Sequence, residues 1–182
     1  MRWDVIKSEI VYRCRIFTVR RDTSASASSG RQHDFHVLEV DDWVNVVPIT
    51  TDGRVVMVRQ FRHGIGDLTL EVPAGLIDAT DASPAVAAMR ELREETGYAG
   101  GEVRPLGVVH PNPAIMNNRC HLFVAYDVEV AGPPHWDATE ELAVETVALA
   151  EVPALIRSGA ISNALTLVAF QLLQLAPARA AG

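Results

Sequence analysis

Alternating hydrophobic and polar positions predict that the first third of the chain is built mainly from β-strands. Val5 to Val19 reads as β structure, with apolar residues recurring at short intervals. Thr23 to Gly30 is rich in Ser, Ala and Gly, which indicates a mobile hairpin tip or a linker. Two more strands are predicted over Phe35–Val40 and Trp43–Ile49. The turn residues at positions 51–53 then predict a hairpin between residues 44–50 and 54–60.

A helix is predicted between Ser83 and Gly97. Ser83 is a favourable N-cap and Pro84 suits the first helical position. Gly97 can adopt the left-handed conformation that ends many helices. The apolar stripe of this helix is supplied by Ala85, Val86, Met89 and Leu92.

The second half of the chain alternates strands and loops before it ends in helices. The predicted strands are Val103–His110, His121–Glu129 and Leu142–Ala148, with loops at Pro111–Asn118 and Ala131–Glu141. Residues 152–157 and 162–175 are apolar at helical spacing, interrupted near Ser158-Gly159. Strands, a helix, strands and helices in this order indicate an α+β protein or a mixed-sheet sandwich.

Composition and charge exclude several classes of protein. The chain has 182 residues, a formal charge of −7 and a pI near 5.3, which disfavours a nucleic-acid groove because such a groove needs a basic stripe. No apolar run is long enough for a membrane span, and the N-terminus lacks a secretory h-region. Cys14 and Cys120 lack a metal-ligand spacing and suit a reducing compartment. We therefore expect a soluble cytoplasmic protein without a nucleic-acid or membrane partner.

Three carboxylates crowd one face of the predicted helix. Glu91, Glu94 and Glu95 lie three and four positions apart, where like charges destabilise a helix by roughly 0.2–0.5 kcal/mol per pair. A divalent cation would reverse the sign of this effect, and Mg²⁺ prefers oxygen ligands. The alternative is an ordinary solvated face with salt bridges. If the carboxylates bind a metal ion, the sequence predicts a metal site that acts on a phosphate-containing substrate.

The residues around this cluster resemble a known motif. The stretch from Gly75 to Tyr98 is similar to the Nudix box, G-x5-E-x7-R-E-U-x-E-E-x-G-U, in which U is a bulky aliphatic residue. The match is complete from Arg90 to Gly97, and Tyr98 occupies the last, usually aliphatic, place. The flanking segments 58–62 and 71–78 resemble the ADP-ribose pyrophosphatase branch. The spacing between Gly75 and Arg90 is one residue too long: Asp81 stands at the distance of the family's Glu, and the next residue is an insertion.

The resemblance implies a fold and an assembly. We expect an α+β fold, namely a Nudix-type α/β/α sandwich with a mixed sheet, preceded by a small β-rich N-terminal subdomain. The implied domains are residues 1–40 and residues 41–182. By analogy with dimeric relatives, the N-terminal subdomain would exchange contacts with a second copy in a homodimer.

The resemblance also implies a reaction and a metal site. The reaction is hydrolysis of a nucleoside diphosphate linked to a sugar, with Mg²⁺ as cofactor and Mn²⁺ as an alternative. Carried over by position, Glu91 and Glu95 would be the principal ligands and Glu94 an auxiliary one. The backbone carbonyl of Ala74 would be a further ligand, and Arg90 would orient the carboxylates.

The general base in this branch usually comes from a glutamate on a distant loop. Glu141 is the first choice and Glu140 the second, because both lie in a loop just ahead of a predicted strand. Plain loop charges are the alternative reading for both residues. Two other functions stay open: a Nudix-like sensor that binds a nucleotide without cleaving it, and a hydrolase of oxidised nucleoside triphosphates.

Substrate-binding residues are predicted from the same resemblance. Arg62 suits bidentate contact with the diphosphate, or else forms a salt bridge at the rim. Trp43 would stack a nucleobase, or else pack half-buried in the core. The loop that carries Pro113, Asn117 and Arg119 is expected to set specificity, and its Asn-Pro-Ala sequence looks closer to hydrolases of nucleoside diphosphate sugars.

Overall fold

The structure is a computed structural model, and it describes residues 2–136 and 141–177 of the chain. The chain divides into two compact units, which we describe separately. Unit 1 comprises Met1–Asp42 and His110–Arg119, and unit 2 comprises Trp43–Val109 and Cys120–Gly182. The sequence predicts two domains, residues 1–40 and residues 41–182, and this division stays a prediction.

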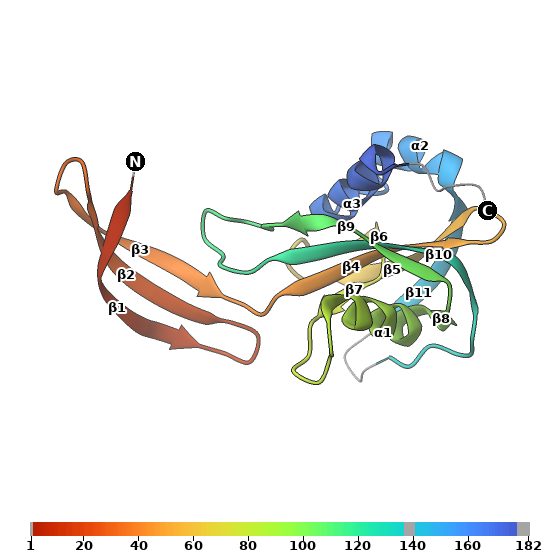
Figure 1. The fold of residues 1–182 in the computed structure, drawn as a ribbon, viewed down its shortest axis with the longest axis horizontal. Helices are drawn as coiled ribbons and strands as arrows, with labels where there is room; N and C mark the ends of the chain where they lie inside the picture. Colours follow the sequence, from red (N-terminus) through yellow and green to blue (C-terminus); the bar gives the residue numbers. More distant parts are fainter. Residues whose placement is uncertain (1, 137–140, 178–182) are drawn as a thin grey trace. The chain divides into compact units, whose positions relative to one another are not determined.

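Unit 1 contains an antiparallel three-stranded sheet. Its strands are β1 (Trp3–Arg13), β2 (Thr18–Ser26) and β3 (Gln32–Glu39), in the order β1-β2-β3 (Figure 1). β2 continues through the first half of the stretch that we predicted as a hairpin tip or linker, so this prediction is wrong for residues 23–26. The reason is that β2 is the central strand and pairs along its length with both neighbours, which satisfies the backbone of these small polar residues.

Unit 2 is organised around a mixed sheet. Among the described residues it has eight strands, with the path β11-β5-β4-β10-β8 and with β6, β7 and β9 paired to β5, β4 and β10. Only β4 and β10 run parallel, whereas the other pairs are antiparallel. The strands are β4 (Trp43–Thr50), β5 (Arg54–Arg62), β6 (Asp67–Glu71), β7 (Ala74–Leu76), β8 (Tyr98–Ala99), β9 (Glu102–Val109), β10 (Cys120–Val130) and β11 (Leu142–Ala148).

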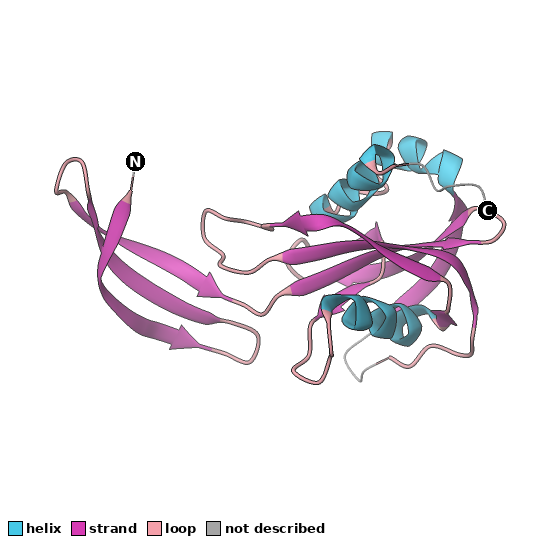
Figure 2. Cartoon of the chain, in the orientation of Figure 1, coloured by secondary structure: helices cyan, strands magenta, loops and turns pink. Residues whose placement is uncertain are grey.

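Helices cover both faces of this sheet, as the predicted sandwich requires (Figure 2). On one face α1 (Pro84–Thr96) packs through Ala87, Ala88 and Leu92. On the other face α2 (Val152–Arg157), which follows a short 3₁₀ turn at Leu149–Glu151, and α3 (Ala164–Leu175) close a second apolar cluster. No helix of the described residues is long and apolar enough to span a membrane.

The ends of α1 confirm the predicted helix. The Ser83 hydroxyl accepts a hydrogen bond from the Val86 N–H at 3.2 Å, and Pro84 is the first helical residue. Gly97 has φ of 75°, and its N–H bonds to the Arg93 carbonyl oxygen. These local signals fix where α1 begins and ends. The predicted apolar stripe is wrong at Val86, which is 47% exposed, whereas Ala87 and Ala88 are buried against the sheet.

Candidate active site

Two carboxylates of α1 lie against the backbone of β7. The Glu95 carboxylate accepts a hydrogen bond from the Ala74 N–H at 3.1 Å, and Glu95 is 5% exposed. The Glu91 carboxylate lies directly over the Cα of Gly75, because a Cβ built there would sit 2.1 Å from the carboxyl carbon. Position 75 therefore requires glycine for the close approach of a side chain, since its φ is not in the left-handed region.

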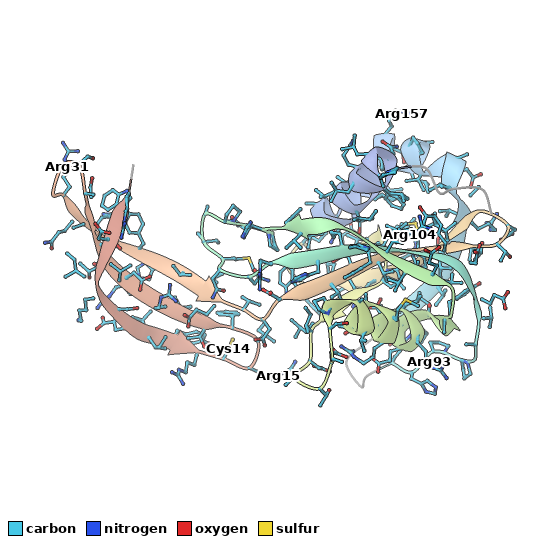
Figure 3. The ribbon with its side chains drawn as sticks, viewed as in Figure 1. Cys14, Arg15, Arg31, Arg93, Arg104 and Arg157 are labelled. Atoms are coloured by element: carbon cyan, nitrogen blue, oxygen red, sulfur yellow. The ribbon has the colours of Figure 1, made fainter. Side chains whose placement is uncertain are left out.

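The third carboxylate of the cluster is more open to solvent. The Glu94 side chain is 44% exposed, whereas that of Glu91 is 14% exposed. Arg93 belongs to the same box but is exposed on α1 (Figure 3). The helix therefore turns Glu91 and Glu95 toward β7, and it leaves Glu94 at the edge of the cluster.

Arg90 joins α1 to the preceding loop. Its guanidinium bonds to Glu91 at 2.8 Å and to Glu94 at 2.9 Å, and it donates to the Leu76 carbonyl oxygen at 2.9 Å. It also reaches both oxygens of Asp81, at 3.2 and 2.9 Å. Hydrogen bonds to Asp81, together with the charges of Glu91 and Glu94, raise the pKa of Arg90. Arg90 thus contacts two of the three box carboxylates, and its role in orienting them stays a prediction.

Asp81 binds Arg90 and its own loop. Its side chain is 5% exposed, and it accepts the Asp78 N–H at 2.9 Å in addition to the bonds from Arg90. The hydrogen bonds from Arg90 are the main reason why the pKa of Asp81 lies below its ordinary value. Asp81 therefore closes the loop onto α1.

The donor set fits a hard divalent cation. Carboxylate and backbone carbonyl oxygens are the ligands that Mg²⁺ and Mn²⁺ prefer. The Glu91 carboxylate fills the space that a side chain at Gly75 would take, so backbone and carboxylate oxygens approach closely there. Within the described residues no three His, Cys, Asp or Glu side chains are arranged as a ready metal cluster, and Arg90 bonds to two of the carboxylates. The residues that would hold the ion are Glu91, Glu95, Glu94 and the Ala74 carbonyl.

Arg62, the predicted diphosphate-binding residue, forms a bidentate ion pair with Glu71. Its Nε and Nη2 donate to the two Glu71 oxygens at 2.8 and 2.7 Å. The Thr69 hydroxyl and the Asn163 side-chain amide, at 2.8 Å, donate to the same carboxylate. Burial opposes ionisation of Glu71, but these hydrogen bonds outweigh it, and the pKa of Glu71 lies below its ordinary value.

The predicted stacking residue Trp43 is half-buried at the start of β4. It packs against the apolar cluster on the α3 side of the sheet, and its backbone pairs with Cys120 and Leu76. This placement agrees with the packing alternative. Stacking of a nucleobase on Trp43 stays a prediction.

The predicted specificity loop belongs to unit 1. Pro113 lies in an exposed turn, and the Asn117 side-chain oxygen accepts the Val40 N–H at 3.1 Å. The Arg119 backbone and guanidinium bond to the Asp42 carboxylate at 2.8 and 3.0 Å. These contacts attach the loop to the segment that leads from β3 to β4. Substrate binding by Pro113, Asn117 and Arg119 stays a prediction.

Of the two candidate bases, Glu140 lies outside the described residues, and Glu141 is exposed immediately before β11. The segment ahead of them is attached to the end of α1. The His135 N–H donates to the Glu94 carbonyl oxygen at 2.8 Å, and the Trp136 indole donates to the Glu95 carbonyl oxygen at 2.9 Å. Residues 135 and 136, ahead of the candidate bases in the sequence, are thus attached to the backbone of α1.

The sequence reasoning named Arg62 and allowed it a salt bridge, but it missed Glu71, Thr69 and Asn163 as the residues around it. Glu71 opens the quoted Glu-Val-Pro-Ala-Gly segment, but its partner Arg62 is identified only when β5 and β6 are paired, with Asp67 opposite Arg62 and Glu71 opposite Val58. Alternation places Arg62 and Glu71 on one face of this hairpin. Asn163 was detectable as a cap, because Asn directly before an apolar helical stretch is a common N-cap.

Comparison with known proteins decides the family. A family model of the NUDIX domain matches residues 41–166, which is more than half of the chain. The chain belongs to the Nudix hydrolase family. This match confirms the predicted family and the predicted class of enzyme, a Nudix hydrolase. Members of this family generally use divalent metals.

The chain is also similar to individual proteins of this family. The chain is 32% identical over 133 residues to the ADP-ribose pyrophosphatase of Bacillus subtilis (strain 168), covering 72% of this chain and 71% of the relative. It is also 32% identical over 170 residues to the GDP-mannose pyrophosphatase of Salmonella typhimurium (strain LT2), covering 87% and 88%. A crystal structure of an ADP compounds hydrolase superposes with a TM-score of 0.83 at 25% identity, covering 96% of this chain and 94% of that one. The predicted α+β Nudix fold is confirmed.

Proposed function

We propose that this Nudix hydrolase cleaves the diphosphate of a nucleoside diphosphate linked to a sugar, such as ADP-ribose or GDP-mannose. The products would be a nucleoside monophosphate and a sugar phosphate. Two relatives of about 30% identity that cover most of the chain are named for these two substrates, which supports the branch. Mg²⁺, or Mn²⁺ in its place, is the proposed cofactor.

The observation that carries the proposal is the contact of Glu95 with the Ala74 N–H and of Glu91 with the backbone of Gly75, which has no side chain. Such a contact brings two carboxylates to the same short strand, and the absence of a side chain at Gly75 leaves room for the Glu91 carboxylate. Glu91, Glu94, Glu95 and the Ala74 carbonyl would hold a divalent ion, which would neutralise charge on the diphosphate and lower the pKa of bound water. Arg90 donates hydrogen bonds to the carboxylates of Glu91 and Glu94, which supports its proposed role in orienting them.

The proposed general base is Glu141, with Glu140 as the second candidate. The support is the attachment of His135 and Trp136, which precede the candidate bases in the sequence, to the carbonyls of Glu94 and Glu95 on α1. General bases typically contribute about 10²–10⁴-fold to the rate. We expect one of the two Glu→Gln variants to lose at least about tenfold in kcat, and if neither does, the loop does not supply the base.

We further propose that the protein is a homodimer formed through unit 1. The support is its exposed apolar side chains, since a monomer rarely exposes many of them in one sheet. Light scattering that gives the mass of a monomer at micromolar concentration would contradict this part of the proposal. The large apolar residues exposed on the three strands include Trp3, Val5, Ile10, Tyr12 and Phe35.

The reaction is tested with a substrate panel. ADP-ribose, GDP-mannose, other nucleotide sugars, dinucleoside polyphosphates and nucleoside triphosphates are incubated with Mg²⁺ or Mn²⁺, and the products are resolved by chromatography. We expect a nucleoside monophosphate and a sugar phosphate from at least one nucleotide sugar, and no turnover with excess chelator. Preference for triphosphates would indicate the housecleaning reaction instead, and tight binding without turnover would indicate a sensor.

The metal site is tested on the same substrate with matched variants. Glu95→Gln should abolish most of the turnover, because it replaces a charged oxygen donor that faces β7. Arg93→Lys is the control, because Arg93 lies on the same helix but is exposed. Full activity of Glu95→Gln would refute the assignment of the metal site.

A further inference from the structure

Glu71 is the most deeply buried carboxylate of the described residues, at 1% exposure. A buried charge is costly unless it is paired and hydrogen-bonded. Glu71 meets this requirement through bonds from three different elements: Arg62 at the end of β5, Thr69 on β6, and Asn163 at the start of α3. Such an arrangement fixes one carboxylate in one orientation.

The hydrogen-bonding capacity of Glu71 is fully used. An ionised carboxylate offers about four acceptor positions. Oε1 accepts from Arg62 Nε and from the Thr69 hydroxyl, and Oε2 accepts from Arg62 Nη2 and from Asn163. Glu71 therefore has no position left for a metal ion or a substrate, and its effect on a reaction must pass through its partners.

Asn163 is itself held rigidly. Its side-chain oxygen caps α3 by accepting the N–H groups of Leu165 and Thr166 at 2.9 and 3.0 Å, while its amide nitrogen donates to Glu71. The same side chain thus connects the end of α3 to the ion pair.

Only one edge of the Arg62 guanidinium is bonded to Glu71. Nε and Nη2 are bound, and among the described residues Nη1 has no hydrogen-bond partner, while the side chain is 41% exposed. The hydrogen bonds that Arg62 donates to Glu71, with the charges of Glu71 and Glu95, raise the pKa of Arg62, so its charge is permanent. An arginine held by one edge presents its other donors in a fixed direction, which suits recognition of a phosphate.

We propose that Glu71 is a positioning residue for diphosphate binding, which holds Arg62 by one edge so that the Nη1 edge faces the diphosphate of the substrate. This inference rests on the proposed function and extends it to residues outside the Nudix box. Glu71, Thr69 and Asn163 then act as one unit through Arg62. The positions of all four side chains are set within unit 2.

The first test is Glu71→Gln, which keeps the size of the side chain but replaces one acceptor oxygen with a donor that faces Arg62. The expected result is a KM for the best nucleotide sugar that is raised about tenfold or more, with kcat within about threefold of wild type, because binding common to the ground state and the transition state is lost. A lower melting temperature with an unchanged KM would show a purely structural role and overturn the inference.

The second test asks whether Glu71 acts through Arg62. Arg62→Lys keeps the charge beside Glu71 but lacks the planar fork, so it should raise KM to a similar extent. Adding Glu71→Gln to Arg62→Lys should then change KM by less than about twofold, since coupled residues are not additive. Independent, multiplying effects on KM would overturn the inference.

Milder variants cover the case in which Glu71→Gln fails to fold. Asn163→Ser keeps an N-cap for α3 but removes the donor to Glu71, and Thr69→Val removes the hydroxyl donor. Either variant should raise KM at least about twofold, because each loosens the carboxylate that fixes Arg62. Wild-type KM in both would refute the proposal.

The experiments distinguish failure of the proposed function from failure of the positioning role. If the wild-type protein cleaves no nucleotide sugar, the proposed function falls and this inference falls with it. If the wild-type protein does cleave one and KM is insensitive to Glu71→Gln, Thr69→Val and Asn163→Ser, the function stands and only the positioning role is refuted.

Discussion

We predict that Gly75→Ala lowers the activity of this enzyme but does not lower its stability. The new methyl group would sit 2.1 Å from the carboxyl carbon of Glu91, whereas an ordinary contact begins at 3.4 Å. The two groups must therefore separate by about 1.3 Å, the difference between these distances. The group that yields is the far end of a flexible side chain, so the fold can accommodate the change while the carboxylate leaves its position.

The expected magnitude follows from this displacement. A misplacement of about 1 Å in a catalytic arrangement can cost roughly 10²-fold in rate, so kcat/KM should fall by about two orders of magnitude. The free energy of unfolding should stay level or rise slightly, because Gly→Ala at a compatible backbone contributes about 0.4–1 kcal/mol through the unfolded state. The displaced ligand should also raise the Mg²⁺ concentration needed for half-maximal rate.

The assay is steady-state hydrolysis of the best nucleotide sugar across a Mg²⁺ titration, combined with urea unfolding. Gly64→Ala is the matched control, because a Cβ at Gly64 meets nothing within 4 Å and its backbone is not left-handed. The control should keep wild-type activity and stability. A Gly75→Ala variant with wild-type kcat/KM and metal dependence would refute the claim that Glu91 must occupy the space over Gly75.

Three further predictions concern α1 and the buried ion pair. Arg90→Lys should lower metal affinity or activity by about 10–100-fold, because residues that orient ligands typically contribute this much, while Arg93→Lys should have no effect in the same assays. Leu92→Ala, at a position with 0% exposure, should cost about 2–5 kcal/mol in urea unfolding without a change in the metal requirement. Because the pKa of Glu71 lies below its ordinary value of 4.5, the ion pair stabilises the fold above about pH 4.5. The difference in unfolding free energy between wild type and Glu71→Gln should thus be constant from pH 7 to about pH 5 and shrink as the pH falls further; a difference that grows toward low pH would contradict the assignment.

Local signals made the carboxylate helix predictable. The cap at Ser83, the proline after it and the left-handed Gly97 act within a few residues of α1, and they fix which side chains share a face. The short strands β6 and β7 left no such signal, because they have only five and three residues and depend on pairing with β5 and β4. The contact of Glu91 with Gly75 depends on β7, so the box predicted that the carboxylates share a helix face without predicting what they pack against.

Contacts between residues far apart in the sequence could not be predicted from the sequence. Glu71 and Asn163 are separated by 92 positions, and nothing in either neighbourhood indicates the other. The loop with Asn117 and Arg119 is a similar case, since both residues bond to a segment 77 positions away. A polar residue in a loop is equally compatible with a substrate and with a distant backbone group, and only the fold distinguishes them.

The departure from the box at Asp81 shows how the fold absorbs a change in a motif. The carboxylate at this position pairs with Arg90 and accepts the Asp78 N–H, so it acts on the arginine that orients the ligands. The extra residue lies before the Ser83 cap, and this cap still accepts the Val86 N–H at the start of α1. Arg90 and Glu91 both follow the cap within the helix, so the longer loop leaves their spacing on α1 unchanged.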